Sequence, residues 1–443
     1  MEKITIQQPV EFESFDQSEL VGRYTSNFEE IQNYVERISE DKYRFWDKAK
    51  HKEPAAGFTA AESWYLARLV RKLSSKSIPV RTPKGESFTW MRLNYTDELL
   101  REIDMYAGGN FLIDGDIRND STQRQKYLTR GIMEEAIASS QLEGADTSRR
   151  YAKKMIAENI KPRNTSDYMI LNNYRTLSRI DDEYKDQDLS KEMLLELHSQ
   201  LTQSTFDDEE DSGRFRVDED DIVVKFDGKI VHEPPKEDIL QRELDRLIEY
   251  ANDKKTFTHP VIKAIILHFW MGYLHPFPDG NGRIARTIFY WYMLKHNYWA
   301  VMYLPISLVI KRAPVRYTYS YIYTEQDNLD FTYFYDFNIK QIIKAIHEFK
   351  EYADRIGNEN ALINEKLKSE VRTNDRQKQI IHFLLGSPEN HTSVTSHAKL
   401  SGITRQTAAK DINGLSNAEL LKPEQYGNSV RYYASDKLKE LAE

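Results

Sequence analysis

The chain has 443 residues, of which 40% are hydrophobic and 30% are charged, and its formal net charge is −8. This balance is typical of a globular protein with more than one domain, and the negative charge argues against a protein that coats nucleic acid. Cysteine is absent, which excludes disulfides, thiolate metal sites and a cysteine nucleophile. No apolar stretch reaches the length of a signal peptide or a membrane span, so we expect a cytoplasmic protein without a membrane partner.

The N-terminal region, residues 1–123, is predicted to consist of helices and loops. A helical pattern covers 60–73 and ends in a cluster of serines and prolines, which break helices. A shorter helix is expected over 99–106, closed by Gly108 and Gly109. We expect these helices to pack around the segment that follows them, and the sequence indicates no separate role for the region.

A mainly α-helical core is predicted over residues 124–357. Its helices are expected at about 124–142, 147–156, 166–185, 190–203, 239–252, 260–273, 284–296 and 331–356. A β-hairpin interrupts them over 221–233, where Asp227 and Gly228 separate two β-rich runs. Asp-Gly predicts a type I′ turn, because both central residues of that turn need positive φ. One hairpin buries little by itself, so it either packs on the helices or presents an exposed edge.

The last residues, 376–443, are predicted to form a separate small domain after a charged linker over 358–375. Helices are expected at about 377–385, 393–401 and 405–415, and a short strand pair is expected around Gly427 and Arg431. Three helices followed by a hairpin are typical of a winged helix-turn-helix domain.

Residues 275–286 read His-Pro-Phe-Pro-Asp-Gly-Asn-Gly-Arg-Ile-Ala-Arg and lie between two predicted helices. A loop that leads into a helix presents free backbone amides and the positive end of the helix dipole. The glycines also permit close approach of the backbone to a ligand. We therefore predict an anion cradle formed by Gly280, Asn281 and Gly282. No lysine follows the glycines, so this is not a Walker-type phosphate loop.

The charged side chains of this segment predict nucleotide chemistry. Arg283 and Arg286 are three residues apart and share a helical face, where two guanidinium groups suit a polyphosphate. Asp279 would repel a phosphate unless a cation lay between them, and Mg²⁺ is held by such a carboxylate together with substrate oxygens. The pKa of a histidine such as His275 suits removal of a proton from a hydroxyl near neutrality. Each residue alone has a structural explanation, but their joint spacing favours a site for nucleotide transfer.

The segment resembles the motif of the Fic family, histidine-x-phenylalanine-x-acid-glycine-asparagine-glycine-arginine-x-x-arginine, at every defining position. The resemblance covers roughly 124–345. It implies a helical core that transfers AMP from ATP to a serine, threonine or tyrosine hydroxyl of a target protein, or of the chain itself, with loss of pyrophosphate. Doc-type relatives with kinase activity differ at the glycine and asparagine positions, which are kept here and favour AMP transfer.

The resemblance also assigns a role to each residue of the segment. His275 would be the general base and Asp279 the Mg²⁺ ligand. The α-phosphate region would be held by Gly280, Asn281 and Gly282, and the outer phosphates by Arg283 and Arg286.

A second segment, 139–144, reads Ser-Ser-Gln-Leu-Glu-Gly and resembles the inhibitory motif of the same family. Ser139 and Glu143 are four residues apart and share a helical face. A glutamate in the last helical turn, beside Gly144, opposes the helix dipole, which indicates a partner outside the helix. The resemblance names Arg286 as that partner and implies that the pair keeps Arg286 from the terminal phosphate. It places the chain in the class with an N-terminal inhibitory helix, here over 124–144.

The predicted hairpin lies where the flap of the family lies. Its residues with an expected role are Ile222, Val223, Val224, Lys225, Ile230, Val231 and His232. An exposed ribbon there would pair with an extended target segment by strand addition and align its hydroxyl. The alternative is a hairpin that only covers the helical core.

A different class of function is a DNA-binding regulator whose core senses a nucleotide. Residues 403–408 resemble the start of a recognition helix that Thr404 caps, and Arg431 would lie in the wing. From Thr373 onward, however, nine Lys and Arg face eight Asp and Glu, whereas DNA binding needs a clearly positive face. Protein docking or dimerisation is therefore an equal alternative for this domain. The intact motif disfavours an inactive scaffold, and the sequence leaves open the target, AMP removal and the oligomeric state.

Overall fold

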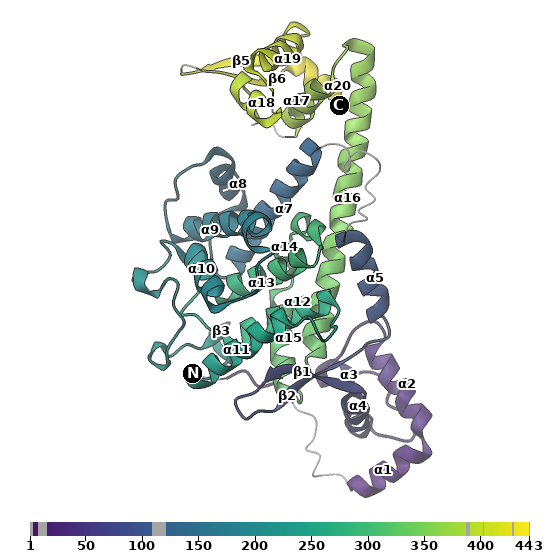
Figure 1. Cartoon of the computed structure of the whole chain (residues 1–443). Coiled ribbons are helices and arrows are strands. Elements are labelled where there is room, and N and C mark those ends of the chain that lie inside the picture. Colours follow the sequence, from purple (N-terminus) through teal and green to yellow (C-terminus); the bar gives the residue numbers. More distant parts are fainter. Residues whose placement is uncertain are drawn as a thin grey trace. The chain divides into compact units, whose positions relative to one another are not determined.

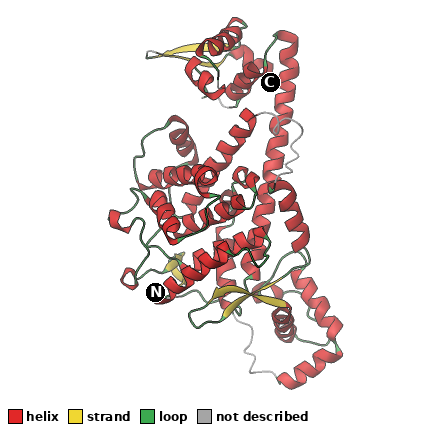
Figure 2. Cartoon of the chain, in the orientation of Figure 1, coloured by secondary structure: helices red, strands yellow, loops and turns green. Residues whose placement is uncertain are grey.

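The computed structural model describes residues 3–7, 16–108, 121–386, 390–401, 403–427 and 429–442. Helices dominate these residues, and their strands form three two-stranded antiparallel sheets (Figure 1, with helices red and strands yellow in Figure 2). The predicted mainly α fold class is confirmed. The chain divides into two compact units, Met1–Phe111 with Leu128–Ile346, and Leu112–Tyr127 with His347–Glu443.

The first unit begins with helices and one hairpin. They are α1 (Gln17–Ser26), α2 (Phe28–Ser39), α3 (Trp46–Ala49), α4 (Ala60–Ser74), β1 (Ser75–Arg81), β2 (Ser87–Met91) and α5 (Thr96–Ala107). The predicted helix over 60–73 is confirmed as α4, which starts at a capping box of Thr59 and Glu62. The hairpin β1–β2 was not predicted. Its serines and proline were interpreted only as the end of a helix, whereas in the structure they occupy strand positions. Residue 109, the second of the two predicted closing glycines, lies outside the described residues.

The remainder of the unit is a helical core with a second hairpin. Its elements are α7 (Ser121–Leu142), α8 (Arg149–Glu158), α9 (Thr165–Arg179), η2 (Ile180–Tyr184), α10 (Lys191–Thr202), η3 (Glu209–Asp211), η4 (Asp218–Asp220), β3 (Val224–Phe226), β4 (Lys229–His232), α11 (Glu237–Asn252), α12 (Pro260–Leu274), α13 (Asn281–Lys295), η5 (Trp299–Tyr303), α14 (Ile306–Lys311), α15 (Pro314–Gln326) and α16 (Thr332–Glu370). The helices α14 and α15 are absent from the prediction. Pro314, which reads as a breaker, is the first residue of α15, where proline is tolerated.

The helices α12 and α13 form the centre of this unit. Every residue of α12 from Val261 to Met271 is buried, and so are all residues of α13 from Arg283 to Leu294. A helix that is covered on all sides is a core helix rather than an amphipathic surface helix. The two pack against each other, and the loop between them carries the predicted catalytic segment.

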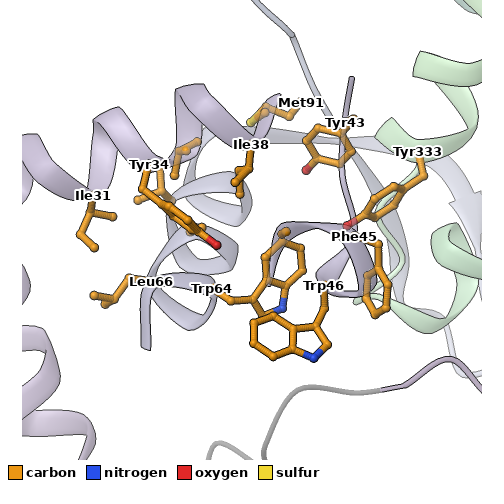
Figure 3. Close-up of a cluster of buried hydrophobic side chains, with 14 of the residues drawn as sticks. Ile31, Tyr34, Ile38, Tyr43, Phe45, Trp46, Trp64, Leu66, Met91 and Tyr333 are labelled. Carbon is orange, nitrogen blue, oxygen red and sulfur yellow. The ribbon is translucent and has the colours of Figure 1, made fainter. Parts of the chain in front are cut away.

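A cluster of buried side chains joins the N-terminal elements to the core (Figure 3). Phe45 and Trp64 meet edge to face with 5.8 Å between ring centroids, and Phe45 stacks on Tyr323 of α15 at 4.9 Å. Tyr333 of α16 and Val231 of β4 belong to the same cluster. The hairpin β3–β4 and the N-terminal elements therefore share one hydrophobic core. The domain boundary at residue 123 stays a prediction.

The hairpin β3–β4 has the predicted turn. Asp227 and Gly228 both have positive φ, 51° and 73°, as the type I′ interpretation requires. The strand predicted from residue 222 begins only at Val224, which pairs with His232 after a register shift. Glu233 is followed by two prolines, which have no N–H to extend the ladder, so Ile222 and Val223 stay outside the strand.

The second unit contains the predicted helices and strand pair. They are α17 (Asp375–Leu385), α18 (Val394–Ser401), α19 (Arg405–Asn417), β5 (Leu421–Tyr426), β6 (Ser429–Ala434) and a further helix, α20 (Asp436–Ala442). Their buried side chains form a separate cluster that includes Ile381, Leu415 and Leu438. The charged stretch predicted as a linker is helical as far as Glu370, because α16 continues through it. No helix among the described residues is long and apolar enough to cross a membrane.

Candidate active site

The loop between α12 and α13 is held in a sharply turned conformation. His275 follows α12 with a φ of 48°, and Gly280, with a φ of 81°, precedes α13. Positive φ suits glycine but is uncommon for a side chain such as histidine, so surrounding contacts must hold it. Arg216 supplies them, because its N–H donates to the Pro276 carbonyl at 2.9 Å and its Nε donates to the His275 carbonyl at 2.7 Å.

Asn281 and His198 brace the loop from inside. The Asn281 side chain accepts from the Phe277 N–H at 2.9 Å and donates to the Phe277 carbonyl at 2.8 Å. The Phe277 ring stacks on His198 with 3.9 Å between centroids. His198 Nε2 donates to the Asp279 carbonyl at 2.8 Å, and Nδ1 accepts the Gly213 N–H at 3.0 Å. The side chain of Asn281 is therefore used within the loop, which leaves its backbone N–H for an anion.

His275 has the tautomer that a general base needs. Its Nδ1 lies 3.0 Å from the Gly272 carbonyl, which can only accept, so Nδ1 carries the proton and Nε2 keeps a lone pair. Burial lowers the pKa of His275 to about 4, although the Gly272 carbonyl opposes this shift. The imidazole is therefore neutral at pH 7, and Nε2 can take a proton.

Arg283 is fully buried and has unused donors. Its Nη1 donates to the Leu201 carbonyl at 2.7 Å. Its Nε and Nη2 form no hydrogen bond with any described residue, and Nη2 lies 3.6 Å from Asp279 Oδ2. A buried donor without a partner costs about 1–3 kcal/mol, and more when it is charged. A bound anion would therefore be stabilised here.

Arg286 is bound by the end of α7. Its Nε donates to Ser139 Oγ at 2.8 Å, and its Nη2 donates to the Ser139 carbonyl at 2.8 Å and to Glu143 Oε1 at 2.9 Å. Burial alone would lower the pKa of Arg286, but the Glu143 carboxylate more than offsets this, so the pKa is raised. The Ser139 carbonyl belongs to the last turn of the helix, where carbonyls lack helical partners. The guanidinium thus caps α7 as well as pairing with Glu143, and Gly144 follows with a φ of 95°.

The carboxylate of Glu143 lies over the predicted anion cradle. A Cβ atom added to Gly282 would overlap this carboxylate. The position is the first turn of α13, where backbone amides and the helix dipole favour negative charge. Glu143 therefore lies where the amides of α13 and Arg286 would bind a phosphate oxygen.

Asp279 is exposed to solvent, as a ligand of a partly hydrated cation would be. Its side chain is 62% exposed. Among the described residues, no group of three His, Asp or Glu side chains could hold a metal ion by itself. A single exposed carboxylate fits Mg²⁺ that takes its other ligands from phosphates and water.

The hairpin is anchored beside His275 by His232. Its Nε2 lies 2.7 Å from the Tyr273 carbonyl, and its Nδ1 lies 2.7 Å from Glu325 Oε2. Burial alone would lower the pKa of His232, but the Glu325 carboxylate outweighs burial and raises it. Both ring nitrogens face acceptors, so a protonated imidazole with two donors fits this arrangement. The strand β4 is thereby bonded to the end of α12, two residues before His275.

The structure brings Ser139 and Glu143 into contact with Arg286, and the Glu143 carboxylate also lies against Gly282. Three further residues, His198, Arg216 and Glu325, hold this arrangement and were not predicted. His198 lies on α10, Arg216 on the loop between η3 and η4, and Glu325 on α15, and none belongs to a local motif. Their contacts with the loop and with His232 arise from tertiary packing, which cannot be read from the sequence.

Comparisons with known proteins match part of this chain to one family. Residues 188–293 match the Fic/DOC family. The chain is 27% identical over 121 residues to protein adenylyltransferase fic-1 of Caenorhabditis elegans, a match that covers 27% of this chain and 22% of that protein. It is 34% identical over 58 residues to protein adenylyltransferase Fic of Nematostella vectensis, over 13% of this chain and 14% of the relative. The matches thus span less than a quarter of each of these curated relatives.

Solved structures include a Fic family protein from Desulfovibrio desulfuricans G20, which is 18% identical, with a TM-score of 0.49 over 78% of this chain and 97% of that one. A fragment of Fic-1 from C. elegans gives 16% identity and a TM-score of 0.47 over 74% of this chain and 83% of that one. Residues 275–286 carry the complete motif inside the matched segment, so the chain contains a Fic/DOC segment over residues 188–293.

Proposed function

We propose that this chain is a protein adenylyltransferase that moves AMP from ATP to a hydroxyl of a protein, and that Glu143 restrains it. Matches to proteins named adenylyltransferases support the reaction class. The geometry adds a neutral histidine, a cradle at the start of α13 and buried arginines. ATP and Mg²⁺ are the substrate and the ion that such a site needs.

The reaction is an in-line transfer at the α-phosphorus. The acceptor oxygen attacks, its proton passes to His275 Nε2, and a new P–O bond forms. The bond between the α-phosphorus and the oxygen bridging to the β-phosphate breaks, and pyrophosphate leaves with the electron pair. The amides of Gly280 and Gly282 and the free donors of Arg283 would stabilise charge on the phosphates. Asp279 would hold Mg²⁺, which neutralises phosphate charge when bound.

The restraint follows because the Glu143 carboxylate and a phosphate of ATP would compete for the same binding position. Glu143 occupies the cradle over Gly282 and binds Arg286 Nη2 at 2.9 Å, so a phosphate oxygen and this carboxylate exclude each other. Productive binding of ATP then requires Glu143 to move. The position of this carboxylate is the observation that carries the proposal, because it marks an anion site at the end of the catalytic loop.

Labelling with ATP that carries an isotope in its α-phosphate tests both parts of the proposal. Glu143→Gly should raise self-labelling or labelling of lysate proteins at least fivefold, as expected when a coupling of about 1–3 kcal/mol is removed. Adding His275→Ala to that variant should lower transfer by about 10²–10⁴-fold. Labelling by Glu143→Gln, which keeps the size of the side chain but not its charge, should be intermediate between that of wild type and that of Glu143→Gly.

Two results would contradict this assignment. Transfer that survives His275→Ala at full rate would exclude His275 as the base. Equal labelling by wild type and Glu143→Gly would exclude the restraint but not the transfer.

A second candidate function, DNA binding by the second unit, is favoured by one observation. An isolated antiparallel bridge joins Thr392, just before α18, to Tyr432 of β6, with N–H to carbonyl distances of 2.9 and 2.8 Å, so the hairpin is bonded to the helices of this unit. The exposed side of α19 carries Gln406, Lys410 and Asn413, with no carboxylate among its exposed residues. Filter binding of genomic fragments across a salt series tests it, and retention that does not respond to salt would contradict it.

A further inference from the structure

The helix α19 of the second unit buries one face and exposes the other. Ala408, Ile412 and Leu415 are buried, and the last two belong to the hydrophobic cluster of this unit. The exposed face carries polar side chains at intervals of four, three and four residues, which keeps them in one row on a helix. The row consists of Gln406, Lys410, Asn413 and Asn417. It therefore presents three amides and one ammonium group to solvent.

The row lines an open groove that α17 helps to form. Asn374 and Gln377, at the start of α17, also line it. Its described lining residues include one carboxylate, Asp411, which is buried and accepts from Arg376 Nε at 2.7 Å and from Asn374 Nδ2 at 2.9 Å. That carboxylate is already bound, so the groove is rich in amides and does not repel an anion.

The hydrogen-bonding groups of the row are available to a partner. The side chains of Gln406, Lys410 and Asn413 form no hydrogen bond or ion pair with another described residue. Arg405 and Lys410 are exposed and no carboxylate on α19 is, so this face is positive although Lys and Arg nearly balance Asp and Glu beyond residue 373. A partner of this face must therefore offer donors and acceptors in register and carry negative charge.

These properties favour duplex DNA over a protein or RNA. Protein interfaces depend on aromatic or aliphatic anchors, whereas Ala409 and Gly414 are the apolar residues among the described lining of the groove. Single strands are bound mainly by stacking on aromatic rings, which the row lacks. An α-helix fits the major groove of B-form DNA, about 12 Å wide, whereas the major groove of duplex RNA is too narrow to be read.

The order of side chains in the row predicts an order of bases. Asparagine and glutamine each form two hydrogen bonds with N6 and N7 of adenine, and lysine binds O6 and N7 of guanine. Lys410 lies between Gln406 and Asn413 along the helix. The row is about 16 Å long at a rise of 1.5 Å per residue, which corresponds to about five base pairs.

We propose that α19 enters the major groove of duplex DNA, where Gln406 and Asn413 select A·T pairs on either side of a G·C pair that Lys410 selects. The inference rests on DNA binding by the second unit, the second candidate function above, and is independent of AMP transfer. The competing arrangement is docking of a protein on the same face.

Selection from duplexes with a random central stretch tests this readout. The immobilised full-length protein is incubated with the duplexes at a fixed, moderate salt concentration, and the retained molecules are sequenced. They should share an A·T pair, a G·C pair and a second A·T pair in this order. Replacing either A·T pair by G·C should weaken binding by about 5- to 150-fold. Retained duplexes without a common base order would overturn the readout.

Substitutions in the row test which side chain reads which pair. Gln406→Glu should change the preferred base at one A·T position to cytosine, because a carboxylate accepts from the N4 amino group of cytosine. Asn413→Ala should lose the preference of about 5- to 150-fold at the other A·T position only. Gln17→Ala, which removes an exposed amide from α1 of the first unit, is the control and should change no position. An unchanged preference in Gln406→Glu would overturn the assignment.

The variants should fold like the wild type, because the row is exposed and makes no side-chain contact that they would break. Circular dichroism checks this. If the wild type retains duplexes without a base order, the readout fails and DNA binding stands. If it retains no duplex, both fail and docking of a protein is favoured, whereas labelling by Glu143→Gly depends on neither result.

Discussion

Buried histidines make the fold sensitive to acid at the scale of single residues. Burial lowers the pKa of His268 to about 3 and that of His198 to about 4, from ordinary values near 6.5. In the unfolded chain these imidazoles bind protons as the pH falls below about 6.5, whereas in the native chain they stay neutral. Their contribution to stability is therefore complete above that pH and is lost as the pH falls toward 4.

His268→Gln tests this dependence. Glutamine can keep a hydrogen bond to the Tyr317 hydroxyl, which lies 2.9 Å from His268 Nε2, but it does not titrate. The free energy of unfolding should therefore fall less steeply between pH 6 and pH 4, by up to about 1.4 kcal/mol per pH unit. Urea unfolding of wild type and variant at several pH values measures the slope, and identical slopes would contradict the buried neutral form.

The pH dependence of transfer should reflect the same physics at His275. Because its pKa is lowered to about 4, the lone pair on Nε2 is available throughout the neutral range. We expect kcat/KM for ATP, which reports groups of the free enzyme, to change less than about twofold between pH 7.5 and pH 6 in the Glu143→Gly protein. A decline with an apparent pKa near 6.5 would mean that burial does not keep the His275 imidazole neutral.

At the scale of elements, the turn between α12 and α13 depends on Arg216. Besides the His275 carbonyl, its guanidinium donates to the carbonyls of Leu274 and Pro235. It therefore joins the end of α12, the catalytic loop and the segment after the flap. The planar guanidinium has several donors and makes these hydrogen bonds at once. The ammonium group of a lysine cannot make the same set.

Arg216→Lys should leave buried carbonyls without donors. We expect the free energy of unfolding to fall by about 2–4 kcal/mol. AMP transfer should fall by more than the unfolded fraction of the protein accounts for. Arg214→Lys is the matched control, because the half-buried Arg214 side chain bonds to Asp211, Phe215 and Asp220 and not to the loop between α12 and α13. Urea unfolding and labelling of both variants provide the comparison, and equal effects would contradict a special role for Arg216.

The elements also show what a sequence can predict. The catalytic loop was predictable because its residues are contiguous and the glycines, acid and arginines have distinct chemistry. The type I′ turn at Asp227 was predictable because few residue pairs tolerate it. The contacts of Arg216 were not, since 59 residues separate it from His275 and only tertiary packing joins them. The hydrogen bond from the Ile4 N–H to the Ile230 carbonyl left no signal either, because main-chain pairing accepts most sequences.

At the scale of the whole molecule, every residue of the candidate site lies in the first unit. Residues 139–144, 216–233 and 275–286 all fall within Leu128–Ile346. The second unit has its own hydrophobic cluster, as an independently folding domain does. The predicted separation of a C-terminal domain at 376–443 stays a prediction that truncation can test.

Ending the chain after Arg372 removes α17–α20. We expect self-labelling by the truncated Glu143→Gly protein to stay within about twofold of the full-length variant, because no site residue is lost. Circular dichroism checks that the remaining chain is folded. A folded truncated protein without labelling would show that the second unit takes part in the reaction.

The room above Gly282 has one further consequence. A Cβ atom at this position would overlap the Glu143 carboxylate, so a substitution that displaces Glu143 would itself occupy the space proposed for a phosphate oxygen. Variants that are permanently active should therefore arise on α7 and not on the motif. Under the proposed restraint, selection would adjust the strength of inhibition through α7, which supplies the carboxylate, while the sequence of the loop between α12 and α13 stays unchanged.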